Sequence, residues 1–173
     1  QVKGGVIPTV FIPAVEKGVK QALDQGIIAG YPVEDVRVIV YDGKSHAVDS
    51  KEIAFVTAGR KAVIDAVLKA TPILLEPIVN IEITAPDRFV GDLTSDISGK
   101  RGQVTGTEST GGDLMAIKGM VPLSEIADYQ SRLRSVTGGQ GAYTIEFSHY
   151  APVPPHMQQQ LQAQFKPAMA EED

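Results

Sequence analysis

The polar segment from Asp42 to Ser50 carries the side chains of this sequence that are best suited to chemistry. Lys44, Ser45 and His46 follow one another there, so an ammonium group, a hydroxyl and an imidazole lie on one short loop. Such groups can hydrogen-bond to the RNA backbone and stack on RNA bases. An ordinary solvated loop is the competing interpretation, because a single loop rarely reveals a function. Lys44, Ser45 and His46 are therefore candidate RNA-contacting residues.

A catalytic interpretation of the same loop has less support. Ser45, His46 and Asp49 are the residue types of a hydrolase triad, but triads are assembled from separated elements beside an oxyanion hole. Asp49 with Glu52 three residues later matches a capping box at the start of a helix, which accounts for the aspartate. We therefore predict no catalytic residue in this chain.

The sequence offers no pattern for a metal ion or a bound cofactor. Its three histidines, at positions 46, 149 and 156, lack metal-ligand spacing, and there is no cysteine. The absence of cysteine also excludes a disulfide scaffold and fits a reducing compartment. The phosphate-binding pattern G-x-x-x-x-G-K-[ST] does not occur in the 173 residues, so we expect this chain alone neither to bind nor to hydrolyse GTP.

A second pair of basic residues, Lys100 and Arg101, follows a predicted helix. These side chains are candidates to contact RNA phosphates, or they offset the negative end of the helix dipole. The residues alone favour the second interpretation, because basic residues are common in the last turn of helices. The Gly138-Gly139-Gln140-Gly141 segment is interpreted as a turn that needs positive φ angles, at the opposite end of the predicted sheet from Lys100 and Arg101.

The overall charge limits how this chain could bind RNA. The net charge is −5 and the isoelectric point is about 5.2, whereas a general nucleic-acid binder is usually basic. Any RNA contact is therefore expected to be local and made by a few loops. No apolar run approaches the roughly 18 residues that span a bilayer, so no membrane partner is expected. The first residues, beginning at Gln1, do not resemble a signal peptide, and the sequence does not begin with a methionine. We therefore expect the chain to be a fragment.

The first half of the chain is predicted to fold as helix, strand, helix. A helix is expected between Pro13 and Gly26, and alternating valines at 36, 38 and 40 predict a half-buried strand. A second helix is expected to run from the capping box to Thr71-Pro72. Its predicted buried stripe, made mostly of small residues for close packing against a sheet, is Phe55, Ala58, Ala62, Ala66 and Ala70.

The second half predicts the order strand, helix, two strands, helix, strand. This βαββαβ order is the ferredoxin-like arrangement. The strands are expected at 79–83, 103–108, 114–121 and 143–147, and the helices at 89–97 and from Pro122 to 136. A last amphipathic helix is expected around 157–165, followed by an acidic tail at 171–173.

Many short motifs in this order resemble the C-terminal part of elongation factor G, a translational GTPase. The motifs that resemble its domain IV are GGVIP (4–8), IPAVEKG (12–18), AGYPV (29–33), YDG (41–43) and HAVDS (46–50). The motifs that resemble its domain V are LLEPI (74–78), KRG (100–102), VPLSE (121–125), LRSVT (133–137) and YTIEFSHY (143–150). The resemblance covers nearly the whole chain.

The resemblance implies an α+β protein made of two small α/β-sandwich units. Residues 1–73 would form an incomplete domain like the second domain of ribosomal protein S5, and residues 74–155 a ferredoxin-like domain. Residues 156–173 would add a C-terminal helix and an acidic tail. An incomplete first sheet is expected to leave an apolar face or an unpaired edge, which favours association between copies.

The resemblance also implies a function. The full-length parent would be a cytoplasmic, ribosome-dependent GTPase that uses GTP and Mg²⁺ and moves transfer RNA and messenger RNA through the ribosome. The histidine at position 46 would reach the decoding centre and help to keep codon and anticodon paired. The second unit would approach the GTPase-associated centre, where Lys100 and Arg101 would be candidate contacts.

Two departures from the family pattern keep other functions open. Ala47 stands where most members have an acid, and Gln140 where an arginine is common. These differences point to a specialised paralogue, acting in ribosome recycling or ribosome protection, as the first alternative. A protein-interaction module without RNA contact is the second, since the acidic residues of the second half would repel RNA phosphates.

Overall fold

The chain divides into two units, and each is described separately. The structure is a computed structural model that describes residues 7–46 and 50–165. The first unit groups Gln1–Leu74 with Pro154–Asp173, and the second unit is Leu75–Val153. The domain limits expected from the sequence, at 73/74 and 155/156, stay predictions. The α+β class is confirmed, since helices precede a four-stranded antiparallel sheet that carries its own helices.

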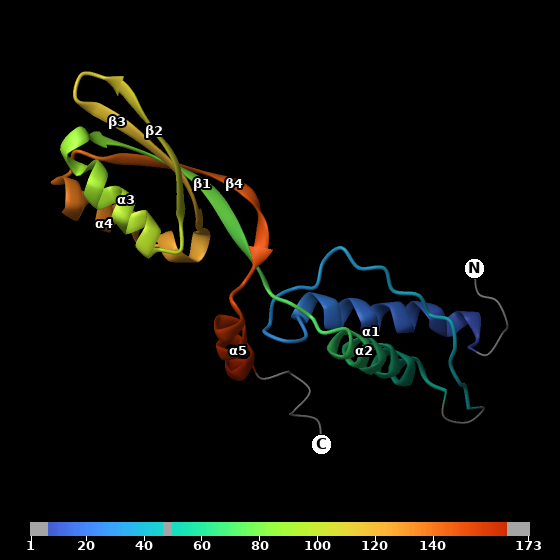
Figure 1. Ribbon diagram of the computed structural model, residues 1–173. Coiled ribbons are helices and arrows are strands. Elements are labelled where there is room, and N and C mark those ends of the chain that lie inside the picture. Colours follow the sequence, from blue (N-terminus) through green and yellow to red (C-terminus); the bar gives the residue numbers. More distant parts are fainter. Residues whose placement is uncertain (1–6, 47–49, 166–173) are drawn as a thin grey trace. The chain divides into compact units, whose positions relative to one another are not determined.

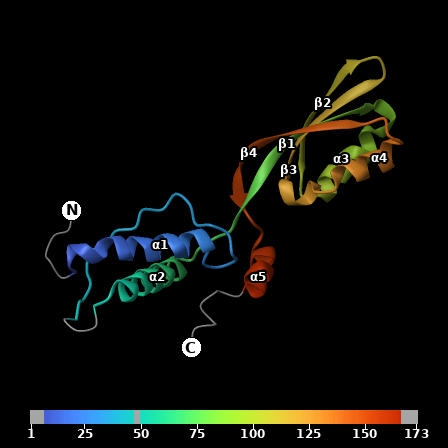
Figure 2. The same cartoon turned by 180° about the vertical axis from the view of Figure 1, so that it is seen from behind.

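Two helices that lie side by side form the centre of the first unit (Figures 1 and 2). The helix α1 spans Ile12–Gln25 and follows a short 3-10 helix, η1, at Thr9–Phe11. The helix α2 spans Glu52–Lys69, and α5 spans Pro155–Gln164. As predicted, α1 has proline in its first turn and ends at Gly26, whose φ of 77° suits glycine.

Glycines allow α1 and α2 to approach closely. A Cβ atom at Gly18 would lie 1.9 Å from the carbonyl oxygen of Val56, and one at Gly59 would lie 2.6 Å from that of Val15. The rings of Phe11 and Phe55 stack beside this contact, with their centroids 4.4 Å apart. The buried cluster that results is Ala14, Val15, Val19, Ala22, Phe55, Val56 and Val63.

The strand predicted at 36–40 is wrong. Residues 34–46 form no strand, and the side chains of the apolar run are exposed, from 43% at Val38 to 91% at Tyr41. The valines and isoleucine gave the segment a high strand propensity, but a strand also needs a neighbouring backbone to receive its hydrogen bonds. Among the described residues of the first unit, no segment pairs with it.

The buried face predicted for α2 is also wrong, except for Phe55. Ala58, Ala62, Ala66 and Ala70 are exposed, while Phe55, Val56, Gly59 and Val63 face α1. The larger side chains remove more apolar area from water against α1 than the alanines would. In the described part of the chain, no sheet covers the alanine face.

The second unit is the predicted βαββαβ fold. Its sheet has the order β2-β3-β1-β4, and every neighbouring pair is antiparallel. The strands are β1 (Leu75–Pro86), β2 (Gln103–Gly111), β3 (Leu114–Pro122) and β4 (Ala142–Pro152). The helices are η2 (Asp87–Phe89), α3 (Val90–Gly99), η3 (Leu123–Ile126) and α4 (Tyr129–Thr137). Figure 1 shows α3 and α4 on the same face of the sheet.

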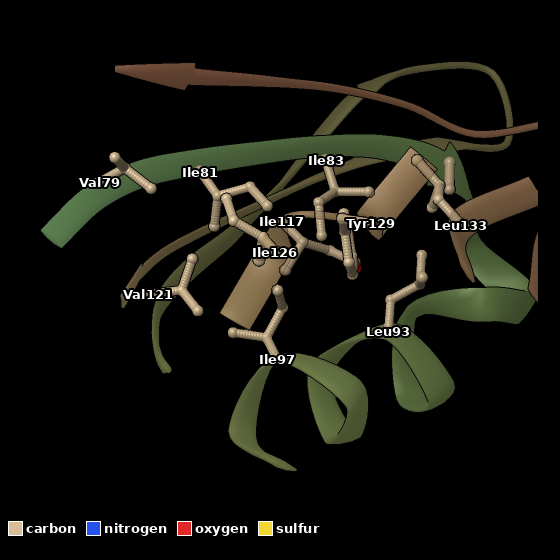
Figure 3. Packing of buried hydrophobic residues seen from close by; sticks show 11 residues of the cluster. Val79, Ile81, Ile83, Leu93, Ile97, Ile117, Val121, Ile126, Tyr129 and Leu133 are labelled. Atoms are coloured by element: carbon tan, nitrogen blue, oxygen red, sulfur yellow. The ribbon is translucent and has the colours of Figure 1, made fainter. Parts of the chain in front are cut away.

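The core of the second unit lies between the sheet and these two helices (Figure 3). Alternating residues of β1 point toward the helices, and Ile83, Leu93 and Leu133 are completely buried. The single helix predicted from Pro122 is instead η3 followed by α4, with a break at residues 127–128. Ile126, Tyr129 and Leu133 are nevertheless buried as predicted.

Candidate RNA interface

The Asp42–His46 loop presents its polar side chains to solvent. Lys44, Ser45 and His46 are all exposed, and their contact with RNA stays a prediction. The loop approaches the start of the first unit's helical pair, because a Cβ atom at Gly43 would lie 2.3 Å from Cδ1 of Ile7. The side chain of Asp42 accepts a hydrogen bond from the Gly43 backbone N–H over 2.7 Å.

Two hydrogen bonds join His46 to Ser50. The backbone N–H of His46 donates to the Ser50 hydroxyl oxygen over 2.9 Å, and the backbone N–H of Ser50 donates to the His46 carbonyl over 3.1 Å. Ser50 directly precedes Lys51, the N-cap residue of α2. The loop is therefore closed onto the start of a helix by Ser50, a residue whose role the sequence did not reveal.

The start of α2 differs from the predicted one. The N-cap of α2 is Lys51, and no side chain makes a cap hydrogen bond there. Asp49, the predicted cap, lies outside the described residues, as does Ala47, so the proposed Ser45–His46–Asp49 arrangement has no described geometry. The prediction placed the helix start two residues too early, because it rested on the aspartate–glutamate spacing alone.

Arg101 holds two acidic side chains in the second unit. Its Nη1 and Nη2 atoms donate to the two carboxylate oxygens of Glu76 over 2.6 and 2.9 Å, and its Nε donates to Glu125 over 2.7 Å. The hydrogen bonds to Glu76 raise the pKa of Arg101 above its usual range, although partial burial opposes this shift. The guanidinium group is therefore engaged on both of its edges.

Lys100 is connected to the same acidic segment. Its Nζ donates to the backbone carbonyl of Glu125 over 3.1 Å, and the side chain is half-buried. This geometry favours a role for Arg101 in joining Glu76 and Glu125 over a role in offsetting the helix dipole. Lys100 contributes to the same connection through the Glu125 carbonyl. Phosphate contact by these two residues stays a prediction. The sequence analysis missed this pairing; the signal that could have indicated it is Glu76, an acid within the apolar run from Leu74 to Ile78.

The glycine-rich turn lies at the other end of the sheet, as predicted. Gly138 and Gly139 adopt φ angles of 61° and 84°. The turn leads into β4, and the first residues of β4 pair with the last residues of β1. Arg88 donates a hydrogen bond to the side-chain oxygen of Gln140, and its guanidinium lies 4.7 Å from the Phe89 ring centroid. A cation that the sequence did not single out therefore stands beside Gln140.

The described part of the chain offers neither a metal cluster nor a membrane-spanning helix. Within 7–46 and 50–165, no group of three or more histidines or acids is placed to hold a metal ion. Across the same ranges, no helix has the length and apolarity needed to cross a bilayer.

An α+β chain whose second unit is an antiparallel βαββαβ fold agrees with the C-terminal region of a translational GTPase, the class that its motifs resemble. Residues 1–71 match the family description "Elongation factor G, domain IV", and residues 73–161 match "Elongation factor G C-terminus". This chain belongs to the elongation factor G family.

Individual relatives agree with this assignment. The chain is 49% identical over 160 residues to elongation factor G of Aquifex pyrophilus, covering 92% of this chain and 23% of the relative. It is 41% identical over 173 residues to the elongation factor G-like protein of Thermotoga maritima, covering 100% of this chain and 25% of the relative. A crystal structure from Thermus thermophilus has a TM-score of 0.76 and 43% identity, over 96% of this chain and 26% of that one. This chain therefore corresponds to only a minor part of the length of each of these relatives.

Proposed function

We propose that this chain is the ribosome-docking part of an elongation factor G-like GTPase that promotes the translocation of transfer RNA and messenger RNA. The observation that carries the proposal is the exposed loop with Lys44, Ser45 and His46, in a chain whose domain IV and C-terminal matches span residues 1–71 and 73–161. The parent is expected to be cytoplasmic and to supply GTP hydrolysis with Mg²⁺ from another part of its chain.

The chemistry of the loop fits a local contact with RNA. A lysine ammonium group pairs with phosphate, and an imidazole can both stack on a base and form hydrogen bonds. Since the chain carries a net charge of −5, the contact depends on this loop rather than on the overall field of the protein. His46 would act at the decoding centre by holding the transfer RNA and its codon in place.

Substitution of His46 in the full-length parent tests this proposal. We expect His46→Ala to slow single-round translocation at least tenfold, a loss of about 1.4 kcal/mol of transition-state stabilisation. Lys61→Ala is the matched control, because Lys61 is an exposed cation on α2 of the same unit. An unchanged translocation rate for His46→Ala would remove the role that we assign to this residue.

The second unit is proposed to anchor the factor near the GTPase-associated centre, with Lys100 and Arg101 as candidate contacts. Because Arg101 already pairs with Glu76 and Glu125, a phosphate contact would have to share its guanidinium group. Ribosome binding by the chain should weaken steeply as salt rises if RNA phosphates are contacted. Binding that is insensitive to salt would instead favour the protein-interaction module.

A specialised paralogue is the second candidate. The match to the elongation factor G-like protein of Thermotoga maritima covers the whole chain, and Ala47 and Gln140 depart from the usual family residues. The full-length parent should rescue a strain depleted of its main elongation factor if it is the translocase. Failure to rescue, with ribosome-dependent GTPase activity retained, would favour recycling or ribosome protection.

Association between copies is a further proposed property of this chain. The 36–41 segment exposes apolar side chains, and an extended segment without a paired neighbour can add to another strand. Sedimentation should show an oligomer that grows with concentration, and Val38→Lys should shift it toward the monomer. A chain that stays monomeric at high micromolar concentration would contradict this proposal.

A further inference from the structure

The hydroxyl of Ser50 accepts a hydrogen bond from the backbone of His46. We propose that Ser50 is a positioning residue: it holds His46 in the orientation that the RNA contact requires. This inference rests on the proposed function of His46 and identifies a residue that orders its loop. Ser50 itself makes no contact with RNA in this proposal.

The two hydrogen bonds between His46 and Ser50 are reciprocal. His46 donates its N–H to the Ser50 Oγ over 2.9 Å, and Ser50 donates its own N–H to the His46 carbonyl over 3.1 Å. Both backbone groups of His46 are thereby fixed, while its side chain stays exposed. A backbone that is held on both sides limits the directions in which the imidazole can point.

Ser50 is itself attached to the rigid part of the first unit. It is half-buried and precedes Lys51, whose carbonyl accepts the Ala54 N–H over 3.1 Å in the first turn of α2. Phe55 and Val56 follow directly and are buried against α1. Ser50 is therefore separated from the packed core only by the short segment 51–54.

The other side of the loop also rests on the core. Gly43 lies so close to Ile7 that a Cβ atom would meet its side chain at 2.3 Å, and Ile7 packs on the buried cluster of α1 and α2. Packing at Gly43 and the hydrogen bonds at Ser50 are thus two of the contacts that attach the described part of the loop. Of these two, only the Ser50 attachment depends on a single hydroxyl group.

Removing that hydroxyl should loosen the loop without unfolding the unit. Because the His46 N–H is exposed, water can replace the lost acceptor. The free energy of unfolding should therefore change little. The loss would appear as a smaller population of the orientation that binds RNA, which lowers apparent affinity in proportion. Ser50→Thr keeps the hydroxyl and should preserve the orientation.

The first experiment measures the loop directly in this chain. Amide hydrogen exchange at His46 should become about two- to tenfold faster in Ser50→Ala, the range that corresponds to one ordinary hydrogen bond. Ser50→Thr should restore the original exchange rate, and Thr57→Ala, which removes an exposed hydroxyl from α2, should change nothing. An unchanged rate in Ser50→Ala overturns the inference without reference to any ribosome.

The second experiment uses the full-length parent and measures single-round translocation. Ser50→Ala should slow it about two- to tenfold, Ser50→Thr should not, and Ser50→Ala should add no further slowing to His46→Ala. A normal rate in Ser50→Ala beside a slow His46→Ala overturns the positioning role and leaves the proposed function intact. A normal rate in His46→Ala overturns the proposed function, and the positioning role with it.

Discussion

The two units of this chain use apolar residues in different ways. The second unit buries alternating residues of β1 against α3 and α4, and the sheet supplies a backbone partner for each strand. The first unit buries one face of each of two helices and leaves the 36–41 segment and the alanine face of α2 exposed. The difference shows that an apolar pattern predicts which face of an element is suited to burial, but not whether a partner covers it.

The largest expected effect comes from the core of the second unit. Ile81 and Ile145 are opposite each other on β1 and β4, yet Ile81 is 2% exposed and Ile145 is 45% exposed at the sheet edge. Ile81→Ala should lower the free energy of unfolding by about 2–5 kcal/mol, because it leaves a cavity in a packed core. Ile145→Ala should cost less than about 1 kcal/mol. Urea denaturation of both variants checks this difference. Equal losses of unfolding free energy would contradict the placement of Ile145 at the exposed edge of the sheet.

The next effect concerns the ion pairs of Arg101. Arg101→Ala should lower the free energy of unfolding by about 2–3 kcal/mol, since the Glu76 carboxylate, whose side chain is 11% exposed, loses its partner. The left-handed backbone at Arg101, with φ of 57°, is as strained for alanine as for arginine, so the substitution isolates the side chain.

Controls make the Arg101 prediction specific. Arg88→Ala removes an exposed guanidinium that bonds to Gln140 and should change stability by less than about 0.5 kcal/mol. Glu76→Gln should recover part of the loss in the Arg101→Ala background, because it removes the unpaired charge. Equal stability of Arg101→Ala and the unsubstituted chain in thermal denaturation would contradict the stabilising role of these ion pairs.

A glycine-to-alanine pair compares helix packing in the two units. Gly18→Ala should destabilise the first unit by about 1–3 kcal/mol, because its Cβ would lie 1.9 Å from the Val56 carbonyl oxygen. Gly91→Ala, in an exposed turn of α3 with no atom within 4 Å of the new Cβ, should stabilise the second unit by about 0.5–1 kcal/mol. Thermal denaturation followed separately in each unit should show opposite signs. An unchanged or raised stability in Gly18→Ala would contradict the close contact between α1 and α2.

The sequence was sufficient where local signals and tertiary contacts agree. The proline start and glycine end of α1, the consecutive strands at 103–108 and 114–121, and the βαββαβ order were all predicted and are present. The family also followed from short motifs. The break between η3 and α4 was missed, because the apolar spacing of Ile126, Tyr129 and Leu133 is compatible with one continuous helix.

The remaining errors concern partners that are distant in sequence. Val36, Val38 and Val40 have the strand pattern but no neighbouring backbone among the described residues, which propensity cannot report. For the candidate sites, residue type singled out Lys44, Ser45 and His46 as candidates, and their contact with RNA stays a prediction. Residue type was not enough for Arg101, whose pairing depends on Glu76, 25 positions earlier in the chain.

The smallest expected effect tests the exposed face of α2. Ala62 is exposed there, and alanine and glutamine differ little in helix propensity, so Ala62→Gln should change the free energy of unfolding by less than about 0.5 kcal/mol. The matched substitution on the buried face, Val63→Gln, should cost several times more, because it places an amide in the cluster of α1 and α2. Urea denaturation at low protein concentration measures both. If Ala62→Gln were as costly as Val63→Gln, another surface would have to cover the alanine face in solution, and repeating the measurement across protein concentrations would show whether that surface belongs to a second copy.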